Sequence, residues 1–366
     1  MSEPLDRRLA ARIARHGPMT VAEFMGRVLT DPQQGYYMSG DPFGARGDFV
    51  TAPEISQMFG ELLGLWCAET WQRLGAPDPV LLVELGPGRG TLMADALRAA
   101  GALPAFRQAL RLHLVEISPA LRRLQAETLS GQIEPANTAW HDNLFELPEQ
   151  PMLLLANEFF DALPIRQFER APEGWCERLV VCDAEASNRL AFALSPPSPH
   201  YVNLLPESLR GHPPGSVAEL CPSGLAIAEE IGRRLAAHGG AALIIDYGAA
   251  RPSGRSTLQA VRRHAPQNVL ESPGTADLTA HVDFGALASA AEAAGAATHG
   301  PLAQGAFLRQ LGIAERAAAL SRNAKAAQEA GIQAALARLT DPAEMGEHFQ
   351  VLAVTAGTAA VPAGFA

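Results

Sequence analysis

Residues 81–91 read Leu-Leu-Val-Glu-Leu-Gly-Pro-Gly-Arg-Gly-Thr, an apolar run that leads into a glycine-rich turn. The run predicts a strand over 80–85, and Thr91 is the expected N-cap of a helix that ends near Gly101. Glycines two residues apart let the backbone turn sharply, and they let a ligand approach closer than any Cβ would permit. The stretch therefore predicts a strand, a turn and a helix that together hold a nucleotide-like cofactor.

The spacing of the glycines separates two classes of nucleotide-binding turn. A dinucleotide-binding turn has Gly-x-Gly-x-x-Gly, with its third glycine where this chain has Thr91, and an apolar residue is usual in place of Glu84. This chain instead has Glu-x-Gly-x-Gly-x-Gly, formed by Glu84, Gly86, Gly88 and Gly90. The pattern resembles the first motif of class I methyltransferases, which bind S-adenosylmethionine (SAM). The resemblance implies SAM as the cofactor and makes an NAD-dependent oxidoreductase the least favoured function.

Residues 80–157 alternate between apolar strand patterns and helical patterns. Strands are expected at 80–85, 112–116, 138–140 and 152–157, and helices at 91–100 and 119–131. Near-continuous apolar runs such as 153–156 are typical of strands that are buried on both faces of a parallel sheet. The predicted fold class is α/β, a class I SAM-dependent methyltransferase fold that is Rossmann-like, with a doubly wound, mostly parallel sheet.

Four segments are expected along the chain. They are N-terminal helices and a lid loop (1–75), the SAM-binding core (76–165), an inserted substrate lobe (166–240) and the C-terminal part of the core with helical additions (241–366). The lobe is expected to be rich in loops because seven prolines fall within 195–222. Beyond it, helices are predicted at 223–237, 284–295 and 312–338, and strands at 242–248 and 349–355. At the N-terminus, Leu5, Leu9 and Ile13 have the spacing of a helix that docks on the surface.

Acidic residues at the strand ends are candidate cofactor contacts, because ligands of a doubly wound sheet bind beyond the carboxyl ends of its strands. Glu116 ends the second strand, where a carboxylate can accept hydrogen bonds from both ribose hydroxyls. Asp142 follows the third strand and is expected to accept from the adenine amino group, with Asn143 beside it. Glu84 is expected to take up the ammonium of the methionine moiety. The spacing from Glu84 to Glu116 exceeds a compact unit, which predicts an insertion around 101–109.

A second motif follows the fourth strand, Asn157-Glu158-Phe159-Phe160-Asp161-Ala162-Leu163-Pro164. Together with Gly-Asp-Phe-Val-Thr-Ala-Pro-Glu-Ile-Ser at 47–56, Asp-Tyr-Gly at 246–248 and Thr-Ala-His-Val-Asp-Phe at 279–284, it resembles the MidA family over residues 15–356. That family includes the mitochondrial complex I assembly factor, which methylates an arginine on a core subunit of the peripheral arm. The resemblance implies a SAM-dependent methyltransferase, and these motifs are more specific than the glycine turn.

An arginine acceptor requires acidic partners. A guanidinium presents planar donors, so its natural partner is one or two carboxylates. Glu158 and Asp161 are the expected clamp, with Asn157 beside them, and one carboxylate is expected to take the proton that is lost on methylation. Phe159 and Phe160 are expected to wall the pocket and to stack on the guanidinium. Burial in the core is the alternative for both rings.

The loop 35–56 is expected to fold over the site as a lid. Within it, Asp48, Thr51 and Glu54 are the expected pocket-lining residues. The alternative is a packed surface loop in which Thr51 caps a helix that begins near Pro53.

Three residues further along the chain are also candidates. Asp246 and Tyr247 end the fifth strand, and His281 is a candidate acid or base near neutral pH. A structural role is the alternative for all three. Any single acid at a strand end also fits an ordinary solvated residue, so the order of the acids along the chain is what favours a cofactor site.

Composition argues against several kinds of partner and site. The 366 residues include 29 basic and 39 acidic side chains, and the net charge of -10 disfavours nucleic acid as a partner. No apolar stretch approaches the roughly 20 residues that cross a bilayer, so no membrane insertion is expected. The four cysteines lack Cys-x-x-Cys spacing, which predicts reduced thiols and no metal site. The expected location is the cytoplasm of a bacterium.

The leading function, by resemblance to the MidA family, is protein arginine N-methylation of a respiratory complex I subunit, which aids assembly of the complex. A non-catalytic assembly partner that retains the SAM fold is one alternative, and incorporation of labelled methyl separates it from an enzyme. A small-molecule methyltransferase is the other, and it requires a closed pocket in 165–240. The expected partners are a protein substrate, including a peripheral-arm subunit of complex I, and a second copy of the chain in a homodimer.

Overall fold

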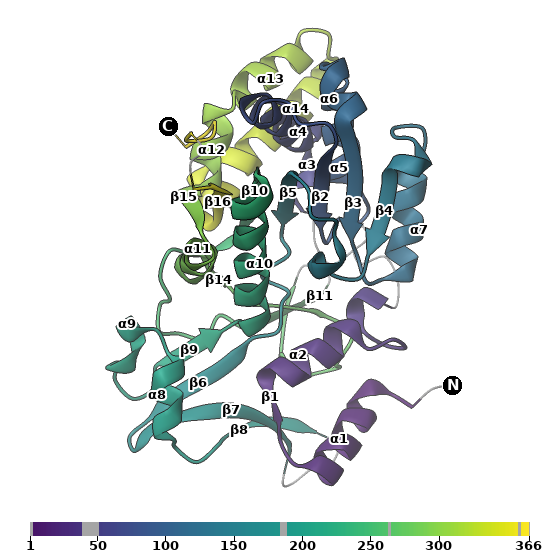
Figure 1. The fold of residues 1–366 in the computed structure, drawn as a ribbon. Helices are drawn as coiled ribbons and strands as arrows, with labels where there is room; N and C mark the ends of the chain where they lie inside the picture. The colour runs from purple at the N-terminus through teal and green to yellow at the C-terminus, as the bar shows by residue number, and fades with distance from the viewer. Residues whose placement is uncertain (1–2, 39–50, 184–188, 263–264, 358–359, 366) are drawn as a thin grey trace. The chain divides into compact units, whose positions relative to one another are not determined.

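The computed structural model describes residues 3–38, 51–183, 189–262, 265–357 and 360–365. The chain forms two compact units, each assembled from stretches that are distant in sequence (Figure 1). The first unit comprises Met1–Phe49, Asp161–Leu225 and Arg251–His281, and the second comprises Val50–Phe160, Ala226–Ala250 and Val282–Ala366. The functional segments expected at 1–75, 76–165, 166–240 and 241–366 stay a prediction.

An eight-stranded sheet forms the centre of the second unit. Its strands are β2 (Val80–Leu85), β3 (Leu110–Val115), β4 (Thr138–His141), β5 (Met152–Asn157), β10 (Gly240–Ala249), β14 (Val282–Asp283), β15 (Ala296–Ala303) and β16 (Phe349–Ala356). The order is β15-β16-β10-β5-β2-β3-β4, with β14 paired to the end of β10. The two pairs that involve β16 are antiparallel and the other pairs are parallel. This confirms the doubly wound, mostly parallel α/β class predicted from the sequence.

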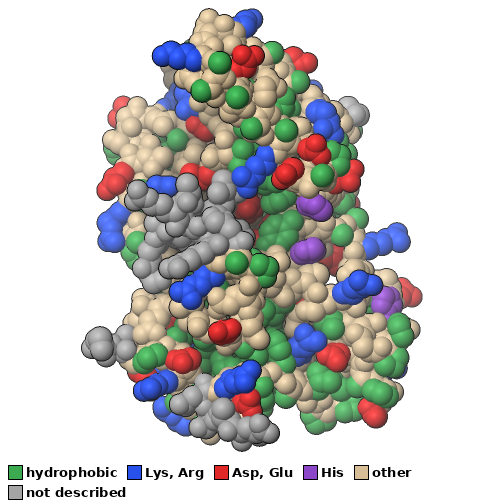
Figure 2. All heavy atoms as spheres, turned by 180° about the vertical axis from the view of Figure 1, so that it is seen from behind, with side chains coloured by type: hydrophobic (Ala, Val, Ile, Leu, Met, Phe, Trp, Pro, Cys, Tyr) green, Lys and Arg blue, Asp and Glu red, His purple; other side chains and the backbone are tan. Residues whose placement is uncertain are grey.

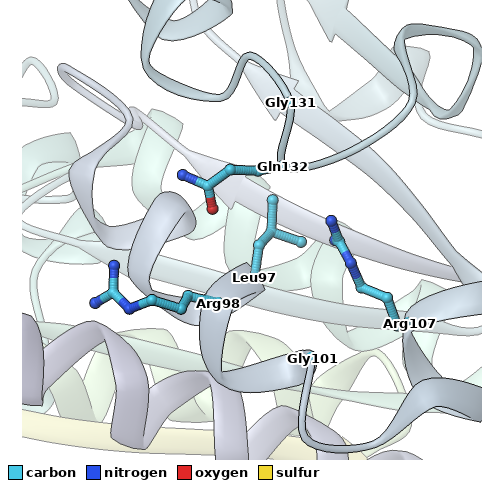
Figure 3. A pocket seen from close by; sticks show the side chains of 6 residues that line it. All are labelled: Leu97, Arg98, Gly101, Arg107, Gly131 and Gln132. Atoms are coloured by element: carbon cyan, nitrogen blue, oxygen red, sulfur yellow. The ribbon is translucent and has the colours of Figure 1, made fainter.

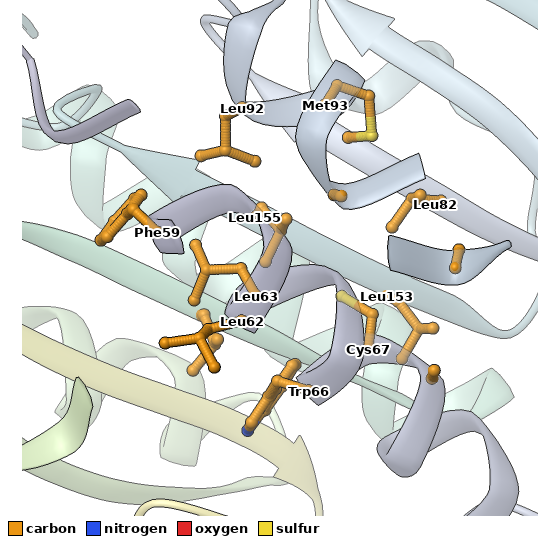
Figure 4. Close-up of a cluster of buried hydrophobic side chains, with 14 of the residues drawn as sticks. Phe59, Leu62, Leu63, Trp66, Cys67, Leu82, Leu92, Met93, Leu153 and Leu155 are labelled. Atoms are coloured by element: carbon orange, nitrogen blue, oxygen red, sulfur yellow. The ribbon is translucent and has the colours of Figure 1, made fainter. Parts of the chain in front are cut away.

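Helices cover the sheet, and this burial explains why its central strands are apolar. The helices are α4 (Gln57–Arg73), α5 (Thr91–Ala100), α6 (Pro104–Ala109), α7 (Pro119–Thr128), α11 (Phe284–Ala293), α12 (Gln304–Gln310), α13 (Ile313–Ser321), α14 (Ala326–Thr340) and most of α10 (Pro222–His238). All six residues of β2 are buried. In Figure 4, side chains of α4 and α5 meet Leu82 of β2 and Leu153 and Leu155 of β5 in one apolar cluster.

Two glycines bring α4 against α5, the helix that begins at the glycine turn. A Cβ added at Gly60 would lie 2.7 Å from the Cβ of Asp95, and one added at Gly64 would lie 2.5 Å from the carbonyl oxygen of Ala96. Any larger residue at either position would separate the two helices, because packed interiors leave no room for an extra methyl group. The close packing fixes α5, and with it the turn at its start.

The observed elements follow the predicted ones closely along the core. The strands at 80–85 and 152–157 and the helix at 91–100 have the expected bounds, and α6 occupies the expected insertion at 101–109. The helical region expected at 312–338 consists of two helices, α13 and α14. The second begins at Ala326, and the backbone N–H of its N-cap, Lys325, donates to Oε1 of Gln328 at 2.9 Å.

The first unit contains an antiparallel sheet of five strands. They are β1 (Met19–Thr20), β6 (Arg166–Ala171), β7 (Gly174–Cys182), β8 (Leu190–Leu194) and β9 (Val217–Leu220), with the order β1-β7-β6-β9 and β8 paired to β7. A smaller sheet joins β11 (Gln259–Arg262), β12 (Ala265–Gln267) and β13 (Asp277–Thr279). The proline-rich segment 195–222 contains α8 (Pro199–Leu204), α9 (Glu207–Arg210) and β9. The sequence patterns did not predict the antiparallel strands.

The N-terminal helix α1 (Leu5–His16) packs as the sequence predicts. Leu5, Leu9 and Ile13 are buried in a cluster with residues of α2 (Val21–Thr30). Arg8 of α1 forms two hydrogen bonds to the carboxylate of Asp31, at 2.8 and 3.0 Å. A bidentate pair of this kind adds geometric specificity to the apolar contact.

The surface of the described residues mixes the two signs of charge. On the face in Figure 2, acidic and basic side chains are interspersed. None of the helices in the described ranges is both long and apolar enough to traverse a bilayer. Across the same ranges, no cluster of three or more His, Cys, Asp or Glu side chains has the arrangement of a metal site. The four cysteines are free thiols.

Candidate functional site

The glycine turn joins β2 to α5 in a conformation that requires glycine. Gly86, Gly88 and Gly90 have φ angles of +61°, +53° and +83°, all in the left-handed region, which side chains with a Cβ rarely adopt. A Cβ at Gly86 would lie 2.9 Å from Cδ2 of Phe159. The turn is therefore shaped by backbone and by one aromatic ring, and it lies at a helix N-terminus, where anionic and polar ligand groups bind.

The N-cap predicted for α5 is wrong. The N-cap is Gly90, and Thr91 is the first helical residue. The Thr91 hydroxyl instead donates to Oε1 of Glu54 at 2.5 Å, and Oε2 of Glu54 lies 3.9 Å from a guanidinium nitrogen of Arg89. The hydroxyl serves a tertiary contact because the left-handed glycine before it already begins the helix.

Glu54 belongs to α3 (Ala52–Ile55), within the loop that the sequence predicted as a lid. The structure brings Glu54 against the glycine turn. Thr51 occupies the N-cap position of α3, but its side chain makes no capping hydrogen bond. Asp48 lies outside the described residues.

Two buried polar atoms at adjacent strand ends lack a partner within the described residues. They are Oε2 of Glu84 on β2 and Oδ1 of Asn157 on β5. Burial raises the pKa of Glu84 to about 8. An unsatisfied buried polar group costs about 1–3 kcal/mol. Two such acceptors beside the glycine turn therefore fit a ligand that carries a positive charge and hydrogen-bond donors, as the methionine end of SAM does.

Glu116, which follows β3, is held by a glutamine that the sequence analysis missed. Its two carboxylate oxygens accept hydrogen bonds from the backbone N–H of Ser118 at 2.8 Å and from Nε2 of Gln125 at 3.2 Å. The same amide group of Gln125 donates to the carbonyl oxygen of Gly88 at 2.8 Å. Oε1 of Gln125 accepts from the indole N–H of Trp140 at 2.9 Å. Gln125 thus ties the glycine turn, the acid after β3 and strand β4 together.

Gln125 is fully buried, and its signal in the sequence was weak. It lies in the middle of α7, where a glutamine normally faces solvent. The only hint was its position in the helix between two predicted strands of the sheet.

Asp142 and Asn143 form an exposed turn after β4. Arg122 bridges this turn to β3, because Nη2 donates to Asp142 at 2.5 Å and Nε donates to the carbonyl oxygen of Glu116 at 2.7 Å. Glu146 accepts from the backbone N–H of Asp142 at 3.1 Å and from the amide of Asn143 at 2.6 Å. The Asp142 side chain is 71% exposed. The turn is thus preformed, and its carboxylate keeps room for another donor.

Glu158 follows β5 in a strained backbone conformation. Its φ of +51° lies in the left-handed region, where few residues other than glycine are found. The backbone N–H of Glu158 donates to the carbonyl oxygen of Ile245 at 2.9 Å. Oε1 accepts from the backbone N–H of Ala52 at 3.2 Å and from Nδ2 of Asn157 at 3.1 Å. Strain of this kind concentrates at functional sites, which supports the predicted role of Glu158.

Asp246 holds the segment after Glu158 in place. The side chain is fully buried, and its oxygens accept from the backbone N–H groups of Phe160 at 3.0 Å and Tyr247 at 2.9 Å. Phe160 is also buried, and its ring meets that of Phe159 edge to face at 5.4 Å. Phe159 is only half-buried. Phe160 is therefore a core residue, whereas Phe159 lies over the glycine turn.

The remaining candidates lie in the first unit. His281 is exposed, and its backbone N–H donates to the hydroxyl of Thr257 at 2.9 Å. Asp161 is buried. Tyr37 donates to Asp277 at 2.8 Å, and burial together with the charges of Asp277 and Asp161 raises the pKa of Tyr37 well above its usual range. Asp161 therefore belongs to a buried acidic cluster that includes Asp277, which the sequence analysis missed.

Comparison with known proteins identifies the family. The family model described as "S-adenosyl-L-methionine-dependent methyltransferase" matches residues 62–302. The mouse protein arginine methyltransferase NDUFAF7 is 40% identical over 96% of this chain and 84% of its own length, and the human protein is 38% identical over 96% and 83%. A structure from Burkholderia thailandensis, solved with bound S-adenosyl-homocysteine, has a TM-score of 0.86 and 32% identity and covers 99% of this chain and 94% of that one. The chain therefore belongs to this family and is a SAM-dependent methyltransferase.

Proposed function

We propose that this enzyme methylates an arginine of a protein substrate, and that the substrate is a subunit of respiratory complex I. The supporting observation is the identity of 40% over nearly the whole chain to a protein arginine methyltransferase. The resemblance to the MidA family supports complex I as the source of the substrate. The bacterial cytoplasm as the location and a homodimer as the assembly stay predictions.

The proposed cofactor contacts lie at the ends of the strands or just after them. SAM supplies a methyl group on a sulfonium, which is electrophilic without further activation. Glu84 would accept from the ammonium, Glu116 from the ribose hydroxyls, and Asp142 with Asn143 from the adenine amino group. Ile117, which is 44% exposed beside Glu116, offers an apolar surface to the adenine ring. The glycine turn would let the carboxylate end approach the start of α5.

In the proposed reaction, Glu158 binds the acceptor guanidinium and aligns one nitrogen with the methyl group. The role of Asp161 as a second carboxylate stays a prediction. Alignment is the main demand of an in-line displacement, because effective concentration and orientation supply much of the rate. The nitrogen loses a proton as it is alkylated, and Glu158 or Asp161 would accept it. The half-buried ring of Phe159 would stack on the planar cation.

Mass spectrometry of complex I subunits tests the proposed substrate. We expect cells that lack this gene to lose methylation at one arginine, and the purified enzyme to restore labelled methyl to that subunit. If the subunits are unchanged and the purified enzyme transfers no methyl to them, the substrate is another molecule.

Cofactor affinity is expected to rise with pH because of Glu84. With a pKa of about 8, the carboxyl group is largely neutral at pH 6 in the ligand-free protein. An ammonium favours the carboxylate, so binding should release a proton and affinity should rise by up to about tenfold per pH unit towards pH 8. Calorimetry of S-adenosyl-homocysteine binding in two buffers with different ionisation enthalpies measures the proton release.

Glu84→Gln is the matched control, because it keeps the shape and removes the titration. The difference between the two proteins cancels any titration of the ligand itself. The effect of Glu84 on folding stability changes with pH in the opposite direction to its effect on cofactor affinity. A carboxyl whose pKa is raised on folding stabilises the ligand-free protein below about pH 4.5, and this contribution is lost as pH rises through 8. A wild-type affinity that is independent of pH would remove Glu84 from the ammonium site.

Gln125→Leu should weaken binding of S-adenosyl-homocysteine roughly ten- to hundredfold, because Gly88, Glu116 and Trp140 each lose a hydrogen bond. Gln125→Glu should behave differently, since a second carboxyl beside Glu116 would make the affinity fall as pH rises. Calorimetric titrations of both variants across pH measure these effects. Gln108→Leu, an exposed glutamine of α6, is the control and should bind normally. Wild-type affinity in Gln125→Leu would contradict the role of this residue.

A further inference from the structure

Arg107 on α6 is not paired with a carboxylate among the described residues. Its Nη1 is buried and has no hydrogen-bond partner within the described residues. Burial alone lowers the pKa of Arg107, with no contribution from a neighbouring carboxylate. Cations that leave water in a folded protein are normally paired or hydrogen-bonded, because desolvation is costly. The half-buried guanidinium of Arg107 therefore has one buried nitrogen that no described residue satisfies.

Arg107 lines a hollow of about 390 Å³ at the far end of α5. The other lining residues are Leu97, Arg98, Gly101, Gly131 and Gln132. Figure 3 shows the side chains of Arg107 and Gln132 on either side of Leu97. Gly101 and Gly131 add no side chains, which keeps the hollow open. The lining thus combines the Arg107 guanidinium, the paired Arg98, one amide and an apolar surface.

The carboxylates around α5 are already committed to other arginines. Arg98 donates to Asp95 at 2.6 Å and to Glu61 at 3.2 Å. Glu61 also accepts from Arg316 at 2.7 Å. Arg98 and Arg316 therefore share Asp95 and Glu61, and Arg107 is bonded to neither carboxylate. A ligand with a negative charge would pair with the Arg107 guanidinium.

The hollow is separate from the proposed cofactor contacts. Helix α5 begins at the glycine turn and reaches the hollow at its other end. Its 10 residues span roughly 15 Å at 1.5 Å per residue. Arg107 itself comes from α6, the insertion that the spacing between Glu84 and Glu116 predicted. The insertion thus has a role that the cofactor site does not explain.

We propose that this hollow binds a compact oxyanion, a phosphate or carboxylate group, held by the Arg107 guanidinium and by the Gln132 amide. A guanidinium matches either group with two parallel donors, and an amide N–H adds a third. This binding site goes beyond methyl transfer and is independent of the acceptor.

Thermal unfolding of the full chain tests the proposal. Inorganic phosphate and acetate are titrated separately at constant ionic strength set with chloride, because a ligand that binds only the folded state raises the Tm in a saturable way. We expect saturation with at least one anion in the wild type and none in Arg107→Gln. Arg123→Gln removes the same charge from an exposed arginine and should keep the wild-type response. The more effective anion identifies the chemical class of the ligand.

Gln132→Glu provides a second test that does not depend on losing Arg107. A carboxylate facing the hollow should take the place of the ligand, so the Tm should rise without added anion and the response to phosphate or acetate should vanish. Affinity for S-adenosyl-homocysteine should be unchanged by phosphate, which separates this site from the cofactor contacts. A wild-type protein with no saturable response to either anion, or an Arg107→Gln protein that keeps the response, overturns the proposal.

Discussion

Glu158→Gln is expected to lower methyl transfer by about a hundred- to ten-thousandfold while S-adenosyl-homocysteine still binds normally. The amide oxygen can keep accepting from the backbone N–H of Ala52 and from Asn157, so the local fold should survive. The change removes the negative charge that would hold the guanidinium and accept its proton. Transfer of labelled methyl to the subunit, together with calorimetry of cofactor binding, measures the two effects separately.

A second variant at this position tests whether the backbone strain serves the reaction. Glu158→Gly relieves the left-handed conformation at φ +51°, which costs a residue other than glycine roughly 1–2 kcal/mol. We expect the glycine variant to be inactive, with unfolding shifted to higher temperature or unchanged despite the lost side-chain hydrogen bonds. If Glu158→Gln or Glu158→Gly retained full activity on the true substrate, the carboxylate clamp would be wrong.

Gly86→Ala is expected to reduce both cofactor affinity and transfer, by roughly a hundredfold in kcat/KM. The new Cβ pays the left-handed backbone cost at φ +61° and lies 2.9 Å from Phe159, a separation that forces the ring to move. Because the ring lies over the glycine turn, its displacement alters the surface proposed to hold cofactor and acceptor. Calorimetry and steady-state kinetics measure the two losses.

Two further variants separate backbone strain from the clash. Gly75→Ala carries a similar backbone cost at φ +84° with nothing within 4 Å of its Cβ. It should lose stability and keep its cofactor affinity. Adding Phe159→Leu to Gly86→Ala removes the blocking ring and should restore part of the cofactor affinity. Equal affinities for the wild type and Gly86→Ala would show that the turn tolerates a side chain and would undermine the proposed cofactor placement.

The glycine turn and the strand ends of the proposed cofactor site were largely predictable because their signals are local, whereas the cofactor contacts stay predictions. Glu84 and the three glycines lie within seven residues of each other. A parallel sheet brings its carboxyl strand ends to one edge, so Glu116, Asp142 and Asn157 could be placed by position alone. The N-cap was the exception. Thr91 has the right chemistry for a cap, but the left-handed Gly90 takes that position and frees the hydroxyl for Glu54.

The residues that support these groups were not predictable in the same way. Gln125 has the pattern of an ordinary helical glutamine, and only the packing of α7 against the sheet buries it beside Glu116 and Gly88. Asp246 was expected near the acceptor as a pocket residue, yet it satisfies two backbone N–H groups around Phe160 and Tyr247. These partners are 86 and 1 residues away along the chain, respectively. A pattern in the sequence cannot distinguish such a role from a ligand contact.

The sequence by itself determined the sheet, the glycine turn and the acidic strand ends, because hydrophobic periodicity and steric limits on the backbone act over a few neighbouring residues. Tertiary structure alone decided which of these polar groups have protein partners and which are left for a ligand. Among the described residues, Glu84 keeps an unpaired oxygen, Glu116 is held by Gln125, and one buried nitrogen of Arg107 has no partner. The physical reason is that burial and hydrogen bonding depend on contacts between segments far apart in the chain, and these exist only once the layers have packed.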